Sequence, residues 1–229
     1  MKEIIKHTVF ALAFTVLIWG CRQLPEYPIE PSIEFSTVFF KKGEFTDSLF
    51  IQLDFKDGDG DLGLRPDFDV GEPYNPFWYI LKPDGQLLTY ADRNTPPYDT
   101  IPSYEFPYYC STYLVEEPDT FYIKQNLNHF NIFVDFYVKK NGQWNLYDWI
   151  TANPPQCGET YNGRFPLLNI SGQNRPLEGS LKYAMKGAGF EVIFKLDTLK
   201  LQIRIQDRAL HKSNMVETPE FILRDITIN

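Results

Sequence analysis

The stretch Leu49–Gly63, LFIQLDFKDGDGDLG, decides the expected fold and contains the main candidate site. In its first half, Leu49, Ile51, Leu53 and Phe55 alternate with residues of the opposite face, which is the pattern of a strand with one face in a core. Its second half is a run of Asp and Gly, both turn formers. The stretch therefore predicts a β-strand that leads directly into an acidic loop.

Comparable alternation recurs along the chain and predicts an all-β fold. Seventeen prolines and fourteen glycines divide the chain into short pieces, and Asn141-Gly142 is a strong type I′ hairpin signal. Past the N-terminal segment, no ten-residue window has a helical stripe. The further expected strands are 33–39, 77–81, 132–138, 144–146, 181–185, 190–196, 199–205 and 221–228.

The order of these strands favours a two-layer antiparallel sandwich. The C-terminal block has an alternating strand, the polar loop 207–214 and a closing strand, and it resembles the end of an immunoglobulin-like domain. Residues 91–120 and 151–176 lack a period and contain many turn formers. We therefore expect an immunoglobulin-like β-sandwich over 32–229 with a long loop insertion.

The N-terminus indicates export. Lys2 and Lys6 precede the apolar run Thr8–Gly20, which has the length of a signal-peptide core and is short for a permanent membrane helix. Gly20 followed by Cys21 resembles a lipobox, in which the cysteine is lipidated and becomes the first mature residue. Trp19 departs from the small residue usual there.

This resemblance predicts a signal peptide at 1–20, then the lipidated Cys21 and a proline-rich tether at 21–31. An uncleaved membrane anchor and an ordinary secretory signal are the alternatives. The expected location is the cell envelope, on either face of the outer membrane. The full chain carries a net charge of −8, and losing Lys2, Lys6 and Glu3 with the signal makes it −9. That charge argues against nucleic acid as a partner, so the membrane link would be the lipid.

The cysteine count agrees with this compartment. Once Cys21 carries lipid, Cys110 and Cys157 remain as an even pair in an oxidising environment. We expect a disulfide that joins two long loops. Metal binding by the pair is the less favoured reading, because neither CxxC spacing nor a flanking histidine accompanies it.

The acidic loop has the ligand chemistry of a calcium site. Asp57, Asp59 and Asp61 repel one another unless a cation lies between them, and Ca²⁺ accepts such oxygens in flexible geometry. The EF-hand pattern fails, because its sixth position is Leu62 and its twelfth is Phe68. The loop would therefore need a ligand from elsewhere in the chain.

Asp207 is the leading candidate for that ligand, because it ends the strand 199–205 and loops at one end of a sandwich cluster in space. Asp54, Asp67 and Asp69 are weaker candidates. The alternative is a solvated turn without any ion, since Asp and Gly form turns regardless of metal.

Three segments also carry a family resemblance. DGDGDLG at Asp57–Gly63, IQDRALHKSN at Ile205–Asn214 and ETPEF at Glu217–Phe221 resemble a group of Bacteroidota lipoproteins described as immunoglobulin-like, with no assigned activity. The resemblance implies a calcium loop but no reaction. It covers the two ends of the mature chain and leaves 91–176 unmatched.

Aromatic residues of the strand 77–81 and of the long loop 91–120 offer a ligand platform for sugars or a protein partner. Its expected members are Trp78, Tyr104, Tyr108 and Tyr109. The alternative, which we favour, is that half of these side chains alternate into the core or pack the long loop onto the sandwich.

We do not expect an enzyme, because His129 and His211 lie outside any nucleophile motif. Paired carboxylates of a glycoside hydrolase stay open as a remote alternative, at Glu105, Glu116, Glu117 and Glu159. The expected function is a lipid-anchored envelope module that binds a partner or serves a structural role. A glycan-binding accessory lipoprotein is the alternative.

Overall fold

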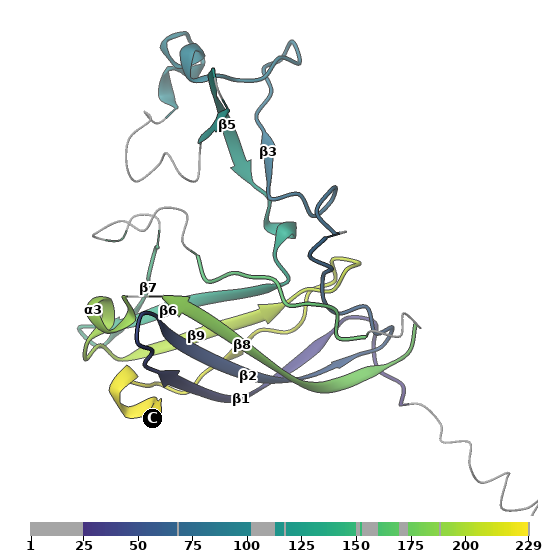
Figure 1. Cartoon of the computed structure of the whole chain (residues 1–229), viewed down its shortest axis with the longest axis vertical. Helices are drawn as coiled ribbons and strands as arrows, with labels where there is room; N and C mark the ends of the chain where they lie inside the picture. The colour runs from purple at the N-terminus through teal and green to yellow at the C-terminus, as the bar shows by residue number, and fades with distance from the viewer. Residues whose placement is uncertain are drawn as a thin grey trace, which may run out of the picture.

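The computed structural model describes residues 25–228 except 68, 102–112, 117, 150–151, 153–159, 170–173 and 188. The chain forms two four-stranded sheets packed as layers and a separate three-stranded sheet (Figure 1). This confirms the expected all-β sandwich. The immunoglobulin-like form within that class stays a prediction.

The first layer has the strand order β11-β1-β2-β8. Its bounds are β1 Ser32–Lys41, β2 Asp47–Asp57, β8 Leu177–Gly187 and β11 Thr227–Ile228. β2 is central and pairs antiparallel with both long neighbours, so Leu53 lies opposite Phe35 on one side and Leu181 on the other. The short β11 pairs parallel with the end of β1.

The second layer has the order β10-β9-β6-β7. Its bounds are β6 Ile132–Lys140, β7 Gln143–Leu146, β9 Leu199–Ile205 and β10 Val216–Glu217. Asn141 and Gly142 join β6 to β7 with φ of 52° and 78°, the left-handed pair that a type I′ turn requires. The predicted hairpin is confirmed.

One hydrophobic core lies between the layers. The alternating residues of β2 and β9 supply its centre, and both sets are buried almost completely, as their period predicts. Each fully buried Leu or Ile contributes about 1.5–3 kcal/mol through loss of apolar surface to water. The strand residues of this core are Ile33, Phe40, Leu49, Ile51, Leu53, Phe55, Ile132, Val134, Phe136, Val138, Leu181, Met185, Leu199, Leu201, Ile203 and Ile205.

Two predicted strands are wrong. Residues 190–196 contain the short helix α3, Phe190–Phe194, in place of a strand. Phe190 and Phe194 lie one turn apart, so a helix buries both rings against Phe136, whereas Val192 on the outer side is exposed. Five residues are too few for the helical period to stand out in the sequence.

The second correction concerns 221–228. Phe221 forms only a bridge to Leu199, and the 3₁₀ helix η4, Leu223–Ile226, follows before β11. Leu223 and Ile226 are three residues apart and both pack on the core, which a 3₁₀ turn achieves because its side chains repeat every third residue.

The insertion also differs from expectation, because it has a sheet of its own. We call residues 64–131 the arm; they stand off one end of the sandwich, at the top of Figure 1. The arm sheet has the order β3-β5-β4, with β3 Phe77–Tyr79, β4 Tyr113–Glu116 and β5 Asp119–Gln125. Its 3₁₀ helices are η1 Tyr90–Asn94, η2 Tyr98–Thr100 and η3 Leu127–His129.

The strand predicted at 77–81 therefore belongs to the arm and lies outside the sandwich. The arm has a small core in which Leu88 and Tyr122 are buried against Tyr98 and Ile101. Such a small core stabilises little by itself. The position of the arm must therefore depend on its contacts with the sandwich.

Candidate metal centre

The acidic loop begins where β2 ends and brings three carboxylates together. Asp57, Asp59 and Asp61 each offer an oxygen, and these oxygens lie within 4.8 Å of one another. Gly60 and Gly63 have φ of 71° and 99°, a conformation that side chains with a Cβ rarely adopt. The glycines therefore let the backbone curl so that alternate carboxylates converge.

Asp57 is the most unusual member of this cluster. Its side chain is 0% exposed, and neither of its carboxylate oxygens has a hydrogen-bond partner. Oδ1 of Asp59 and Oδ1 of Asp61 are also buried without partners. A buried unpaired carboxylate costs several kcal/mol, so the chain alone leaves this cluster poorly compensated.

The electrostatics agree with this geometry. Burial raises the pKa of Asp57 to about 7, and repulsion from Asp59, Asp61 and Asp207 adds to the rise. The nearby N–H of Asp61 offsets a small part of it. The pKa of Asp61 is raised to about 6, again first by burial and then by its acidic neighbours, while Arg208 lowers it in part. Two of the three carboxyls therefore keep their protons to a higher pH than an ordinary aspartate does.

Asp207 lies beside the loop, as the sequence predicts, because β9 ends at the same end of the sandwich as β2. It is 1% exposed, and its charge raises the pKa of Asp57 and of Asp61, while burial and the charge of Asp59 raise the pKa of Asp207 itself. His211 occupies both of its oxygens: the His211 backbone N–H donates to Oδ1 at 2.7 Å, and Nδ1 lies 2.9 Å from Oδ2. Asp207 is therefore an oriented neighbour of the three-carboxylate cluster.

The weaker candidates lie apart from the cluster. Asp54 is exposed on β2 and accepts a hydrogen bond from Ser180. Asp67 is exposed, and Asp69 is ion-paired with Arg65 at 3.0 Å.

Four other segments contact the acidic loop, and of these four the sequence predicts only the one that contains Asp207. Asn169 donates to the Gly60 carbonyl at 3.3 Å, and Ala209 N–H donates to Asp61 Oδ2 at 3.1 Å. A Cβ on Gly60 would lie 2.3 Å from the Arg175 carbonyl oxygen. These are contacts to backbone atoms, which leave no periodic pattern in a sequence.

The fourth segment is the end of the predicted tether. The carbonyl oxygens of Tyr27 and Pro28 lie so close to Gly58 that a Cβ there would approach them to 2.4 and 2.5 Å. Tyr27 also donates to Glu178 Oε2 at 2.6 Å. The expected tether therefore contacts the sandwich before β1 begins.

Several other predicted site residues are not described. Cys21, Cys110 and Cys157 lie outside the described residues, as do Tyr104, Tyr108, Tyr109, Glu105, Glu117 and Glu159. Trp78 is on β3 with 36% of its surface exposed. Glu116 accepts a hydrogen bond from Tyr79 at 2.5 Å. The ligand platform and the lipidation and disulfide sites stay predictions.

A search against family models, curated proteins and solved structures gave no match to this chain. Among the residues that the structure describes, none of the helices has the length and apolar character needed to cross a membrane.

Proposed function

We propose that this chain is a lipid-anchored module of the cell envelope whose β-sandwich is stabilised by a structural Ca²⁺ in the acidic loop. The observation that carries the calcium proposal is Asp57, a fully buried carboxylate with two unpartnered oxygens. A cation between Asp57, Asp59 and Asp61 would convert their repulsion into ligation. The lipid anchor rests on the lipobox-like Gly20-Cys21 sequence.

Calcium suits the loop better than magnesium does. Mg²⁺ demands a near-octahedral shell and keeps several waters, whereas Ca²⁺ takes about six to eight oxygens in irregular geometry. The loop offers carboxylates on alternate residues and a glycine-rich backbone whose carbonyls can turn inward. Asp207 would contribute to the negative charge around the ion while His211 holds its orientation.

The binding role is assigned to the arm. Of the large hydrophobic side chains that are exposed among the described residues, more than half lie on the arm, although it is the smaller part of the chain. This excess of exposed apolar surface favours the arm as the interaction surface. These residues are Val70, Trp78, Ile80, Leu81, Leu87, Tyr90, Val115 and Leu127.

Calorimetric titration of the purified chain with CaCl₂, together with thermal melts in Ca²⁺ and in EGTA, tests the calcium proposal. At 100 times its dissociation constant the ion stabilises by about 2.7 kcal/mol. We therefore expect the melting temperature to rise by about 5–10 °C. Asp57→Asn should abolish both effects. Asp67→Asn, which removes an exposed carboxylate outside the cluster, should retain them. An unchanged melting point and no heat of binding in the wild-type chain would refute the proposal.

The exposed indole of Trp78 favours glycan binding as a second candidate, because a flat ring on the arm can stack on a sugar. Glycan-array binding should then be lost in Trp78→Ala and kept in Trp144→Ala, which removes an indole from the sandwich instead. An array without signal for the wild-type chain would retire this candidate.

A further inference from the structure

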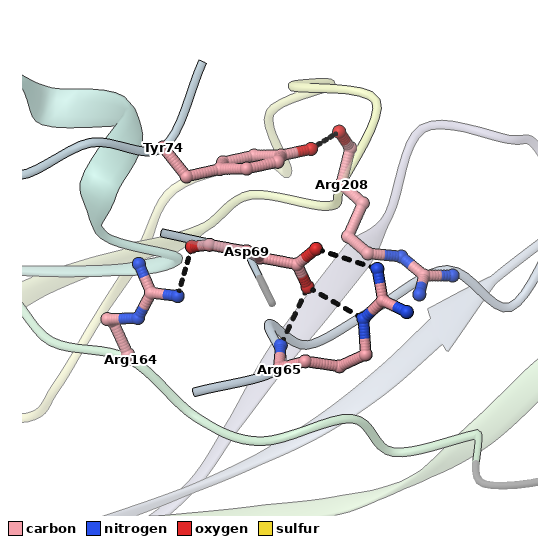
Figure 2. Close-up of polar contacts among 5 residues, drawn as sticks. All are labelled: Arg65, Asp69, Tyr74, Arg164 and Arg208. Carbon is pink, nitrogen blue, oxygen red and sulfur yellow. Dashed lines mark hydrogen bonds and ion pairs between the residues drawn. The ribbon is translucent and has the colours of Figure 1, made fainter. Parts of the chain in front are cut away.

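The arm and the acidic loop are held by the same short turn. In the turn 207–211, the Ala209 N–H donates to Asp61 Oδ2 at 3.1 Å. The preceding residue, Arg208, accepts at its carbonyl a hydrogen bond from the Tyr74 hydroxyl, which lies at the base of the arm (Figure 2). Adjacent residues of one turn therefore contact a proposed cation ligand and the arm.

A second segment, 164–169, also contacts both the arm base and the acidic loop. Arg164 donates from Nη2 to the Asp69 carbonyl and from Nη1 to the His129 carbonyl, both at 2.7 Å. It therefore joins the segment that enters the arm to the segment that returns from it. Figure 2 shows Arg164 at the carbonyl of Asp69 while Arg65 holds the carboxylate of the same residue. Five residues after Arg164, Asn169 contacts the Gly60 carbonyl of the acidic loop.

Hydrogen bonds link the segments of chain that meet at the arm base. His129 Nδ1 lies 2.9 Å from the Tyr74 carbonyl oxygen, which ties the outgoing chain to the returning one. The buried Asn131 then exchanges two hydrogen bonds with the backbone of Phe165, at 2.8 and 2.9 Å. A change at the turn 207–211 or at 164–169 would therefore move the arm base as a unit.

We propose that a divalent cation in the acidic loop fixes the arm against the sandwich through the Asp61–Ala209 and Tyr74–Arg208 contacts. This inference rests on the proposed calcium site. Without the cation, repulsion from Asp57 and Asp59 drives Asp61 away from the cluster, and the Ala209 contact and the turn loosen with it. With the cation, Asp61 is held and the turn presents a fixed Arg208 carbonyl to Tyr74. The coupling is reciprocal, so a partner that holds the arm would tighten cation binding.

Hydrogen–deuterium exchange of the full chain in Ca²⁺ and in EGTA tests the coupling. We expect Ca²⁺ to slow amide exchange both in the loop 57–63 and in the arm base, 64–76 and 126–131. The slowing at the arm base should be about five-fold or more, the low end of ordinary coupling between sites.

Two variants separate the proposed route from general stabilisation. Tyr74→Phe removes only the hydroxyl that bonds to Arg208, so Ca²⁺ should still protect the loop 57–63 while protection of the arm base is reduced. Tyr79→Phe is the matched control, because it removes a hydroxyl bonded to Glu116 within the arm and should behave as wild type.

The outcomes distinguish the two proposals. Protection of 57–63 without any change at the arm base in the wild-type chain overturns the coupling and leaves the calcium site standing. A Tyr74→Phe chain that keeps full protection of the arm base also overturns the coupling. No protection anywhere, with no heat on titration, overturns the calcium site itself.

Discussion

The buried charge of Asp57 should make the calcium-free protein less stable as the pH rises, and Asp57→Asn should remove this dependence. The folded-state pKa of Asp57 is raised to about 7 from an ordinary value of 3.8. Between these values the folded chain binds a proton that the unfolded chain has released, so stability falls as pH rises through that window.

The magnitude follows from the pKa. At pH 5 the folded carboxyl is protonated two pH units below its pKa, and at pH 8 it is ionised, while in the unfolded chain it is ionised at both. At 1.36 kcal/mol per unit, the carboxyl contributes about 2–3 kcal/mol of stability at pH 5 that is lost by pH 8. Coupling to Asp61 spreads part of this loss over both groups.

Urea unfolding in EGTA at pH 5 and pH 8 gives the change in the free energy of unfolding between the two pH values. Comparing this change in the wild type with the change in Asp57→Asn isolates the contribution of the Asp57 carboxyl. Other titrating groups contribute nearly equally to both chains and cancel. The wild type should lose about 2–3 kcal/mol more than the variant between pH 5 and pH 8. At pH 8 without calcium the variant should equal or exceed the wild type in stability, because a neutral amide costs less to bury than a charge. Parallel pH profiles would show that Asp57 carries no buried, raised-pKa carboxyl.

Three further outcomes are expected. Phe194→Ala should lower the free energy of unfolding by about 3–5 kcal/mol in urea titrations, because its ring is buried among aromatic neighbours. Val192→Ala, on the exposed side of α3, should change the free energy of unfolding by less than about 0.5 kcal/mol. Equal losses in the two variants would contradict the orientation of the helix. Gly58→Ala should free the segment around Tyr27, seen as faster amide exchange at 25–31, since the new methyl group meets backbone atoms there; unchanged exchange would refute the contact. Intact-mass analysis of protein from a lipidating host should show a diacylglyceryl adduct that Cys21→Ser abolishes, and an unmodified wild-type chain would exclude the anchor.

Much of the sandwich can be predicted from sequence because its strands are amphipathic. The alternation in Leu49–Phe55 and Leu199–Ile205 specifies which face is buried, and the Asn141-Gly142 turn fixes one hairpin. The approach of Asp207 to the acidic loop also follows, because both segments leave strands at the same end of the sandwich. Here local pattern and global fold agree.

The remaining features depend on contacts that no local pattern encodes. The helix α3 is shorter than two turns, so Phe190 and Phe194 fit an alternating strand as well as a helix. The arm sheet has short strands whose outer faces are themselves apolar, which hides the period. Asn169 reaches the acidic loop through its side-chain amide, which donates to the Gly60 carbonyl, and Tyr27 reaches it through its own carbonyl oxygen. Neither contact leaves a periodic pattern in the sequence.

The position of β1 has a mechanical consequence. A pull on the N-terminus first loads the contacts of Tyr27 and then acts on β1, whose hydrogen bonds to β2 run from the Ser32–Lys56 pair to the Lys41–Ser48 pair. Inter-strand bonds lie across the strand direction, so this force shears them together and cannot unzip them one at a time. The short pairing of β11 with β1 adds little resistance. A chain held at its N-terminus would thus transmit tension into the central strand β2, and β2 ends at Asp57.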